Sequence, residues 1–216
     1  MHALVGRNPP TPRERSIAYF AEDFLVTTVC AIRLSAAEKY RPSGFTRQQL
    51  RAAARMLCQI DGKQIPPADL TAVWTDVTAA VRSFDLHAAR KLLQGFGGGL
   101  TPTGDDVLAG ILLFSNWLDP SNEIASQVAE KTDTSDLSRS FLIWAARGQS
   151  IEPIHALVRS AADLGSSRAK SEATGAYFAH MLAKVRSIGS SSGVAMLAGL
   201  RLAAAAWLAA DHRTDL

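Results

Sequence analysis

Cysteine is scarce in this sequence: Cys30 and Cys58 are the only two in 216 residues. Neither belongs to a CxxC pair or to a Cys/His cluster, which argues against a disulfide framework and against a zinc site. Both lie among apolar residues with helical spacing. We therefore expect two reduced, buried thiols that act as small apolar side chains.

Long runs of one charge and long apolar runs are also missing. Lys and Arg (23) only slightly outnumber Asp and Glu (20), and no five like charges stand together, so we expect no nucleic-acid binding. The N-terminal segment MHALVGRNPPTPRER lacks the apolar stretch of a signal peptide. The longest apolar stretch, 196–210, is interrupted by Arg201 and is shorter than the ~20 residues of a membrane span. These absences predict a cytoplasmic protein that does not enter a membrane.

What the sequence does contain is an ordinary globular mixture, 47% hydrophobic and 20% charged, with abundant alanine. Strand-forming residues are scattered, and no segment alternates strictly between apolar and polar, so the composition favours helices. No linker-like segment divides the chain. We predict one all-α domain over residues 1–216, a compact multi-helix fold in which residues 1–93 form the N-terminal helices and residues 94–216 carry the functional motifs.

The 3.6-residue spacing of apolar side chains predicts where the helices run. A first helix is expected between Pro12 and Arg41, with Phe20, Phe24 and Ile32 near one face. The remaining helices are expected at residues 46–59, 66–83, 86–93, 105–118, 123–129, 137–147, 153–164, 172–185 and 194–210.

A glycine-rich segment interrupts these helices. Five glycines occur within the ten residues of Gly95–Gly104, GFGGGLTPTG, and two aspartates follow as helix resumes. An ordinary connector does not need so many glycines. Glycines before a helix N-terminus let backbone N–H groups approach an anion, as in phosphate-binding loops. We predict that the functional site is built around residues 95–106.

The glycine-rich segment has a counterpart 89 residues later. The stretch TPTGDDVLAGILL at 101–113 aligns without gaps with SSSGVAMLAGLRL at 190–202, and each reads as a hydroxyl-rich loop, a glycine and a helix carrying Leu-Ala-Gly. Chance similarity is an alternative, because Ser/Thr caps and apolar helices are common. We favour two related loop–helix units that pack centrally and face one site, with Gly110 and Gly199 near the helix contacts.

In the first unit, Thr103 and Asp106 have the spacing of a capping box. Two carboxylates more than cancel the half positive charge of a helix N-terminus, so a bare phosphate would be repelled there. The loop is then expected to hold a metal-bridged anion, a cationic partner or a substrate amide, and Mg²⁺ on Asp105 would fit. Asp105 and Asp106 are the candidate catalytic residues, with Asp105 as the functional one and Asp106 as the cap. The other candidate ligand-binding residues of this loop are Gly97, Gly98, Gly99, Thr101, Thr103 and Gly104.

The second unit has no acid in its first turn, so its hydroxyls and free N–H groups are the better cradle for a phosphate or carboxylate. A plain serine cap would explain the same sequence. Arg147, before the helix-ending Gly148, is a further candidate anion ligand. If both loops bind one small ligand, they lie within about 10 Å of each other. The candidate residues of the second loop are Ser190, Ser191, Ser192 and Gly193.

Residues 95–110, GFGGGLTPTGDDVLAG, resemble the signature G-x-G-x-G-L-T-P-S-G-D-D-x-L-x-G of a bacterial family catalogued as a domain of unknown function. One branch of that family is the small subunit of oxamate carbamoyltransferase, from anaerobic allantoin degradation. Residues 134–148 look like the family's helix ending in Ala-Ala-x-Gly, and residues 189–199 look like its second glycine/serine motif. The resemblance implies carbamoyl transfer between carbamoyl phosphate and oxamate within a multi-subunit enzyme.

The interpretation we favour is therefore an enzyme or enzyme subunit that binds a small anionic carbamoyl or acyl compound. A non-catalytic metabolite-binding or regulatory subunit of a catabolic enzyme complex is one alternative. A helical scaffold, in which the glycine-rich loop only turns the chain, is another. The expected partners are a small-molecule anion, other subunits of the complex and further copies of this chain.

Overall fold

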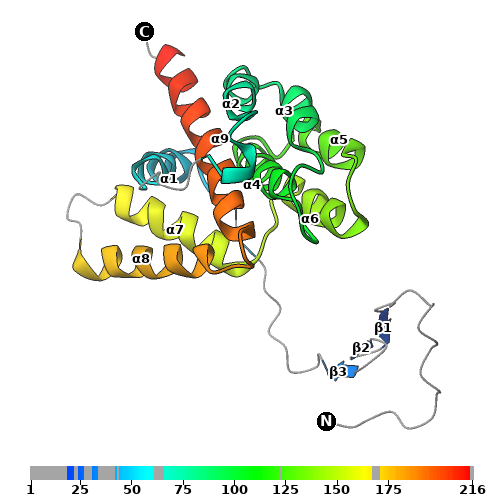
Figure 1. Ribbon diagram of the computed structural model, residues 1–216. Helices are drawn as coiled ribbons and strands as arrows, with labels where there is room; N and C mark the ends of the chain where they lie inside the picture. The colour runs from blue at the N-terminus through cyan, green and yellow to red at the C-terminus, as the bar shows by residue number, and fades with distance from the viewer. Residues whose placement is uncertain are drawn as a thin grey trace, which may run out of the picture. The chain divides into compact units, whose positions relative to one another are not determined.

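The computed structural model describes residues 42, 44–60, 66–121, 123–166 and 171–214, together with three short strands before them (Figure 1). Contacts divide the chain into two compact units, Met1–Arg41 and Pro42–Leu216. Each unit is described by itself. The expectation of one domain over residues 1–216 stays a prediction.

The strands of the first unit form an antiparallel sheet in the order β1-β2-β3, with β1 at Tyr19–Ala21, β2 at Phe24–Val26 and β3 at Ala31–Arg33. Phe20 lies opposite Leu25, and Leu25 lies opposite Ile32. The helix predicted between Pro12 and Arg41 is therefore wrong here. The strands are rich in aromatic and β-branched residues, which favour extended backbone and outweigh an irregular helical spacing: Tyr19, Phe20, Phe24, Val26 and Ile32. The buried-thiol prediction for Cys30 lies outside the described residues.

The second unit confirms the all-α prediction. Eight of the nine α-helices in the described residues of this unit begin and end within a few residues of the predicted bounds. The predicted helix 66–83 is instead broken into a 3₁₀ turn and α2, because Thr71 turns its hydroxyl back to the carbonyl of Ala68. The elements are α1 (Arg47–Gln59), η1 (Ala68–Leu70), α2 (Trp74–Arg82), α3 (Leu86–Leu93), α4 (Thr103–Leu118), α5 (Ile124–Lys131), α6 (Asp136–Ala146), α7 (Glu152–Ser166), α8 (Glu172–Arg186) and α9 (Ser192–Thr214).

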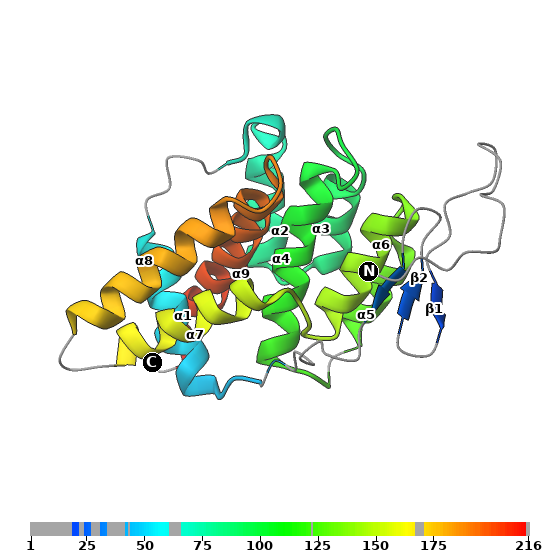
Figure 2. The same ribbon diagram turned by 90° about the horizontal axis from the view of Figure 1, so that it is seen from below.

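Helices α4 and α9 form the centre of this unit, with the other helices around them (Figures 1 and 2). Every residue of α4 from Thr103 to Phe114 is buried. The segment Ser192–Asp211 of α9 is long and apolar enough to cross a membrane, contrary to the expectation that this stretch is too short. Because 56% of that segment is buried within the fold, it serves as a core helix here.

Two glycines allow α4 and α9 to approach closely. A Cβ on Gly110 would overlap the carbonyl oxygen of Met196, and a Cβ on Gly199 would overlap that of Val107. The helices run parallel, as two contacts show. Thr101, just before α4, contacts Ser192 at the start of α9, and Phe114, farther along α4, packs on Trp207, farther along α9. The prediction that Gly110 and Gly199 lie at the contact of these helices is confirmed.

The segments that lead into α4 and α9 have the same local contacts. A Cβ on Gly104 would overlap the carbonyl oxygen of Leu93 at the end of α3, and a Cβ on Gly193 would overlap that of Val185 near the end of α8. The Gly104 N–H donates to the Phe96 carbonyl, as the Gly193 N–H donates to the Ile188 carbonyl. The first loop is three residues longer, counted between these donors and acceptors. These matches favour two related units, which stays a prediction.

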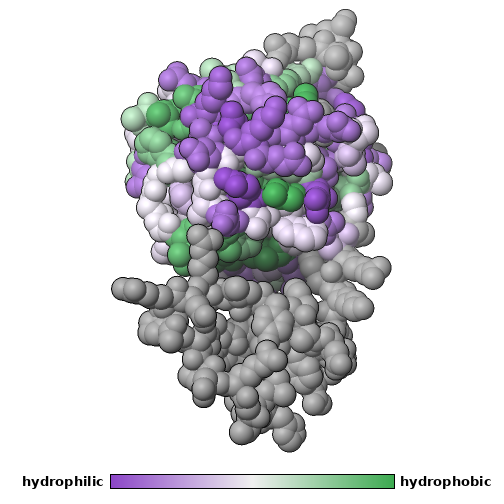
Figure 3. Space-filling view, turned by 90° about the vertical axis from the view of Figure 1, so that its right-hand side faces the viewer, coloured by the Kyte–Doolittle hydropathy of each residue, from purple (hydrophilic) through white to green (hydrophobic). Residues whose placement is uncertain are grey.

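The surface of the domain on the side of α5 and α6 is mostly hydrophilic. Hydrophobic groups reach it in several separate places (Figure 3). One helix on this side, α6, holds the glycine-rich loop with its first turn and exposes large apolar side chains along its outer face.

Candidate functional site

The loop between α3 and α4 follows a path that glycine makes accessible. Gly95, Gly97 and Gly99 have positive φ angles of 65°, 102° and 97°. A Cβ on Gly97 would also lie 2.9 Å from Oγ1 of Thr103, so this position has neither the conformation nor the space for a side chain. Around Gly98 and Gly99 a Cβ would meet nothing within 4 Å. The tip of the loop is thus open to a ligand.

Asp105 fastens this loop to α6. Its Oδ1 accepts from the Gly95 N–H at 2.8 Å, and its Oδ2 accepts from the hydroxyls of Ser138, at 2.6 Å, and Thr134. The side chain is 1% exposed. Since hydrogen-bond donors surround both oxygens, the carboxylate is poorly suited to bind Mg²⁺. Its contacts are those of a structural anchor.

The capping box expected between Thr103 and Asp106 is wrong. Pro102 is the N-cap of α4 and no side chain caps the helix, because the Thr103 hydroxyl donates to Oδ2 of Asp69 in η1 at 2.9 Å. Thr103 is already the first helical residue. Asp106 is therefore left without the capping role that the sequence assigned to it.

Asp106 instead faces the second loop. Its Oδ2 accepts from the Thr101 hydroxyl at 3.3 Å, and the Ser192 hydroxyl also bonds to this carboxylate. Oγ1 of Thr101 lies 3.1 Å from Oγ of Ser192. Burial raises the pKa of Asp106 to about 6; the Ser192 and Thr101 bonds oppose this rise, and the nearby Asp105 adds to it. A carboxyl that changes charge near neutral pH can both accept and donate a proton.

The second loop presents its serines in different ways. Ser190 and Ser191 are exposed, and Ser192, the first residue of α9, is half-buried against Thr101. The Gly193 N–H is already used by the Ile188 carbonyl, and the Gly104 N–H by the Phe96 carbonyl. Both glycines therefore serve close packing, and the groups of this loop that can meet an anion come from Ser190–Ser192.

Three helices point their N-terminal ends at this region. Asp105 in the first turn of α4 contacts Ser138 in the first turn of α6, and Thr101 before α4 contacts Ser192 at the start of α9. The connections that precede α4 and α9 lie at the same edge of the domain (Figure 2). Helix N-termini carry partial positive charge, so their convergence favours an anion where Asp105 and Asp106 do not cancel it.

Arg147 is not part of this arrangement. It ends α6, while Ser138 near the start of α6 contacts Asp105. At a rise of 1.5 Å per residue the two ends of α6 are roughly 15 Å apart. The Arg147 guanidinium instead lies over the ring of Trp144, 5.5 Å from its centroid. The structure thus brings both loops together and separates Arg147 from them.

Three residues around the site were missed by the sequence interpretation. Thr134 and Ser138 bond to Asp105, and Asp69 accepts from Thr103. The cluster of hydroxyls at Thr134, Ser135 and Ser138, at the start of a predicted helix, was the one available signal for the first two. Asp69 had no such signal, because its contact spans 34 positions in the sequence.

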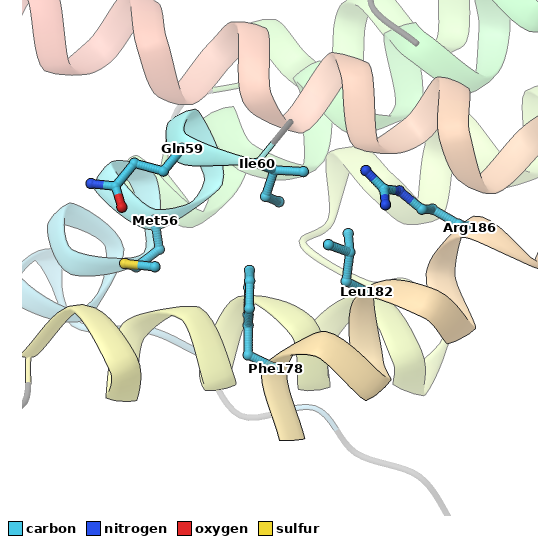
Figure 4. A pocket seen from close by; sticks show the side chains of 6 residues that line it. All are labelled: Met56, Gln59, Ile60, Phe178, Leu182 and Arg186. Atoms are coloured by element: carbon cyan, nitrogen blue, oxygen red, sulfur yellow. The ribbon is translucent and has the colours of Figure 1, made fainter. Parts of the chain in front are cut away.

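A cavity of about 270 Å³ lies elsewhere, between α1 and α8, where Arg186 and Gln59 stand beside apolar side chains (Figure 4). None of the predicted site residues lines it. Among the residues that the structure describes, no group of three or more His, Cys, Asp or Glu is arranged to hold a metal ion.

The model of a protein family described as oxamate carbamoyltransferase subunit AllH matches residues 93–204, which include both loops and helices α4 to α8 in full. No curated protein and no solved structure matches the chain. The match begins at the last residue of α3 and ends within α9, so it covers every predicted site residue.

Proposed function

The chain belongs to the family of oxamate carbamoyltransferase subunit AllH, and we propose that within such an enzyme it binds a small anionic carbamoyl or acyl phosphate compound between its two loops. The observation that carries this proposal is the cluster of Thr101, Asp106 and Ser192. It joins the glycine-rich loop to the serine loop at the N-termini of the two central helices.

The two loops offer complementary chemistry for such a ligand. Its phosphate or carboxylate binds at Ser190–Ser192, where α9 begins with no acid in its first turn. Its amide NH₂ donates to Asp106, whose carboxylate lies next to Ser192. The open glycine tip, Gly98 and Gly99, closes over the ligand. Carbamoyl phosphate carries an amide donor at one end and an anionic phosphate at the other. It therefore suits the Asp106 carboxylate and the serine loop together.

We assign the functional role to Asp106, although the sequence interpretation had assigned it to Asp105. Both oxygens of Asp105 are committed to the loop and to α6, whereas Asp106 accepts from two hydroxyls that belong to the site. A ligand can take the place of these hydroxyls at Asp106, and the Thr101 and Ser192 hydroxyls can then bond to the ligand instead. Burial raises the pKa of Asp106 to about 6, which lets it take or give a proton during transfer near neutral pH.

Binding can be measured by isothermal titration with carbamoyl phosphate and, separately, with inorganic phosphate. Ser192→Ala removes a hydroxyl that touches both Thr101 and Asp106, and we expect it to weaken binding about tenfold or more. Ser121→Ala is the matched control, because the Ser121 hydroxyl bonds to Asp119 beyond the other end of α4. Equal affinity of both variants and the unchanged protein would contradict the proposed site.

A second measurement separates catalysis from binding alone. Carbamoyl transfer to oxamate is assayed with the chain by itself and together with the other subunits of the enzyme. We expect Asp106→Asn to abolish turnover in the complete enzyme while phosphate still binds at the serine loop. Full turnover with Asp106→Asn would show that this carboxyl takes no part in the reaction, and would favour a regulatory binding subunit.

A further inference from the structure

The outer face of α6 exposes an apolar stripe. Leu137, Phe141 and Trp144 are 46%, 48% and 54% exposed, and their spacing of four and three residues aligns them along one side of the helix. This is unusual for a helix whose inner face is well packed, with Leu142 fully buried. Aromatic side chains exposed in a row on a rigid element are typical of protein–protein contacts.

An exposed apolar residue also precedes the helix, and another follows it. Leu100, on the glycine-rich loop, is 81% exposed, and its carbonyl accepts from the hydroxyl of Ser135, the N-cap of α6. Ile151, 45% exposed, follows the C-terminal end of α6. A half-exposed aromatic side chain contributes on the order of 100 Å², so the stripe together with Leu100 exposes a few hundred Å², a substantial part of the ~800 Å² that each partner buries in a stable interface.

We propose that α6 pairs with α6 of a second copy of this chain, antiparallel and about a two-fold axis that passes near Phe141. Phe141 is the middle residue of α6, which spans Asp136–Ala146. A two-fold axis there puts Leu137 of one copy beside the second copy's Trp144, so the stripe covers itself.

The charges of α6 are complementary in the same arrangement. Asp136 opens the helix with a 97% exposed side chain, and Arg147 follows its last turn. In an antiparallel pair, Asp136 of each copy lies beside the second copy's Arg147, so both ends gain an ion pair. Asp136 is free to do this, because its contact with Arg139 in its own chain is long, at 4.0 Å. A parallel pair would set like charges against each other.

The pairing also reaches the candidate site, although it does not depend on the proposed function. Leu100 lies between the open tip of the glycine-rich loop and Thr101, which contacts Asp106. A second copy that covers Leu100 therefore contacts this loop at the point where the loop joins the site. The dimer can be tested without any ligand.

Sedimentation equilibrium of the full chain tests whether the chain forms a dimer and whether Phe141 lies in its interface. We expect a dimer, of twice 23.1 kDa, at micromolar concentration. Phe141→Glu puts a charge at the two-fold axis on both sides, and we expect the dissociation constant to rise by about 100-fold or more. Tyr177→Glu is the control, because Tyr177 is equally exposed, at 50%, but lies on α8. A monomeric unchanged protein, or a dimer indifferent to Phe141→Glu, would overturn the proposal.

Charge reversal tests whether the partner is a second copy of this chain and whether the two α6 helices are antiparallel. Asp136→Arg and Arg147→Asp each set like charges together in their own dimers, and we expect each to weaken association about tenfold. Mixed in equal amounts, the two variants form heterodimers in which both ion pairs are restored, so association returns to within about twofold of the unchanged protein. This result holds even if Phe141→Glu disturbs folding. If the mixture stays as weak as each variant alone, Asp136 and Arg147 do not pair between two copies, and the proposal is refuted.

Discussion

The two neighbouring aspartates of α4 should respond oppositely to the same substitution. Asp106→Asn removes a buried charge but keeps an oxygen that accepts from Thr101 and Ser192. Since burial raises the pKa of Asp106 from 3.8 to about 6 in the folded protein, its ionisation opposes folding. The difference of about two pKa units corresponds to roughly 2–3 kcal/mol at pH 8. We therefore expect Asp106→Asn to stabilise the fold at pH 8.

The stabilisation by Asp106→Asn should increase as pH rises. Between pH 3.8 and about 6 the folded protein holds a proton on Asp106 that the unfolded chain has lost, so the free energy of unfolding falls as pH rises through this window. The asparagine variant does not titrate there. Its advantage should be close to zero near pH 4 and complete above pH 7.

Asp105→Asn should destabilise the fold instead. The carboxylate accepts from Gly95, Ser138 and Thr134 while fully buried, and an amide sets an N–H₂ group against at least one of these donors. Hydrogen bonds to a charged group contribute about 1.5–3 kcal/mol each, so we expect a loss of roughly 2–4 kcal/mol at pH 8. This also frees the glycine-rich loop from α6.

Urea unfolding followed by tryptophan fluorescence and circular dichroism, at several pH values, measures both effects. Wild type and the two variants are compared at pH 4, 6 and 8, conditions chosen to span the Asp106 window. The reasoning is refuted if Asp106→Asn destabilises the fold at pH 8, or if its effect is the same at pH 4. An Asp105→Asn variant as stable as the wild type would equally contradict the anchoring role.

Two further predictions concern the core. Gly110→Ala should destabilise the fold by roughly 2–4 kcal/mol, because the new methyl group overlaps the Met196 carbonyl, whereas Gly175→Ala on open α8 should stabilise it by about 0.5–1 kcal/mol; equal effects in thermal unfolding would contradict the close helix contact. His155 should stay neutral to about pH 4, because its burial and then the Arg159 charge lower its pKa. The stability that it gives above pH 6.5 is therefore lost as pH falls towards 4, and an NMR titration that finds an ordinary imidazole pKa would refute this.

Much of the fold could be predicted from the sequence, because helical periodicity and capping act locally. Thr46, for example, forms a complete capping box with Gln49 at the predicted start of α1. The close contact of Gly110 and Gly199 was also predictable, since a mid-helix glycine costs about 1 kcal/mol and needs a reason. The three strands were not, because short pairing in the first unit outweighs an irregular helical pattern.

The candidate site was predicted in outline but not in its roles. Glycines and hydroxyls before two apolar helices identified both loops from composition alone. The different roles of Asp105 and Asp106 depend on partners that are distant in the sequence. Asp105 bonds to Ser138, and Asp106 bonds to Ser192. Arg147 illustrates the converse, because a residue that suits an anion by type lies at the far end of α6. Local sequence determines what a side chain can do, and long-range packing determines what it faces.

The central position of α9 has a consequence for synthesis on the ribosome. Helix α4 has almost no polar face, yet its main partner α9 begins about 90 residues later in the chain. At about 5–20 residues per second, α4 is outside the ribosome for several seconds before α9 can cover it. During that interval the nascent chain exposes the most apolar helix-packing surface of the domain, so chaperone demand should be greatest then. Ribosome stalling between α4 and α9 would yield a chain that cannot complete its core.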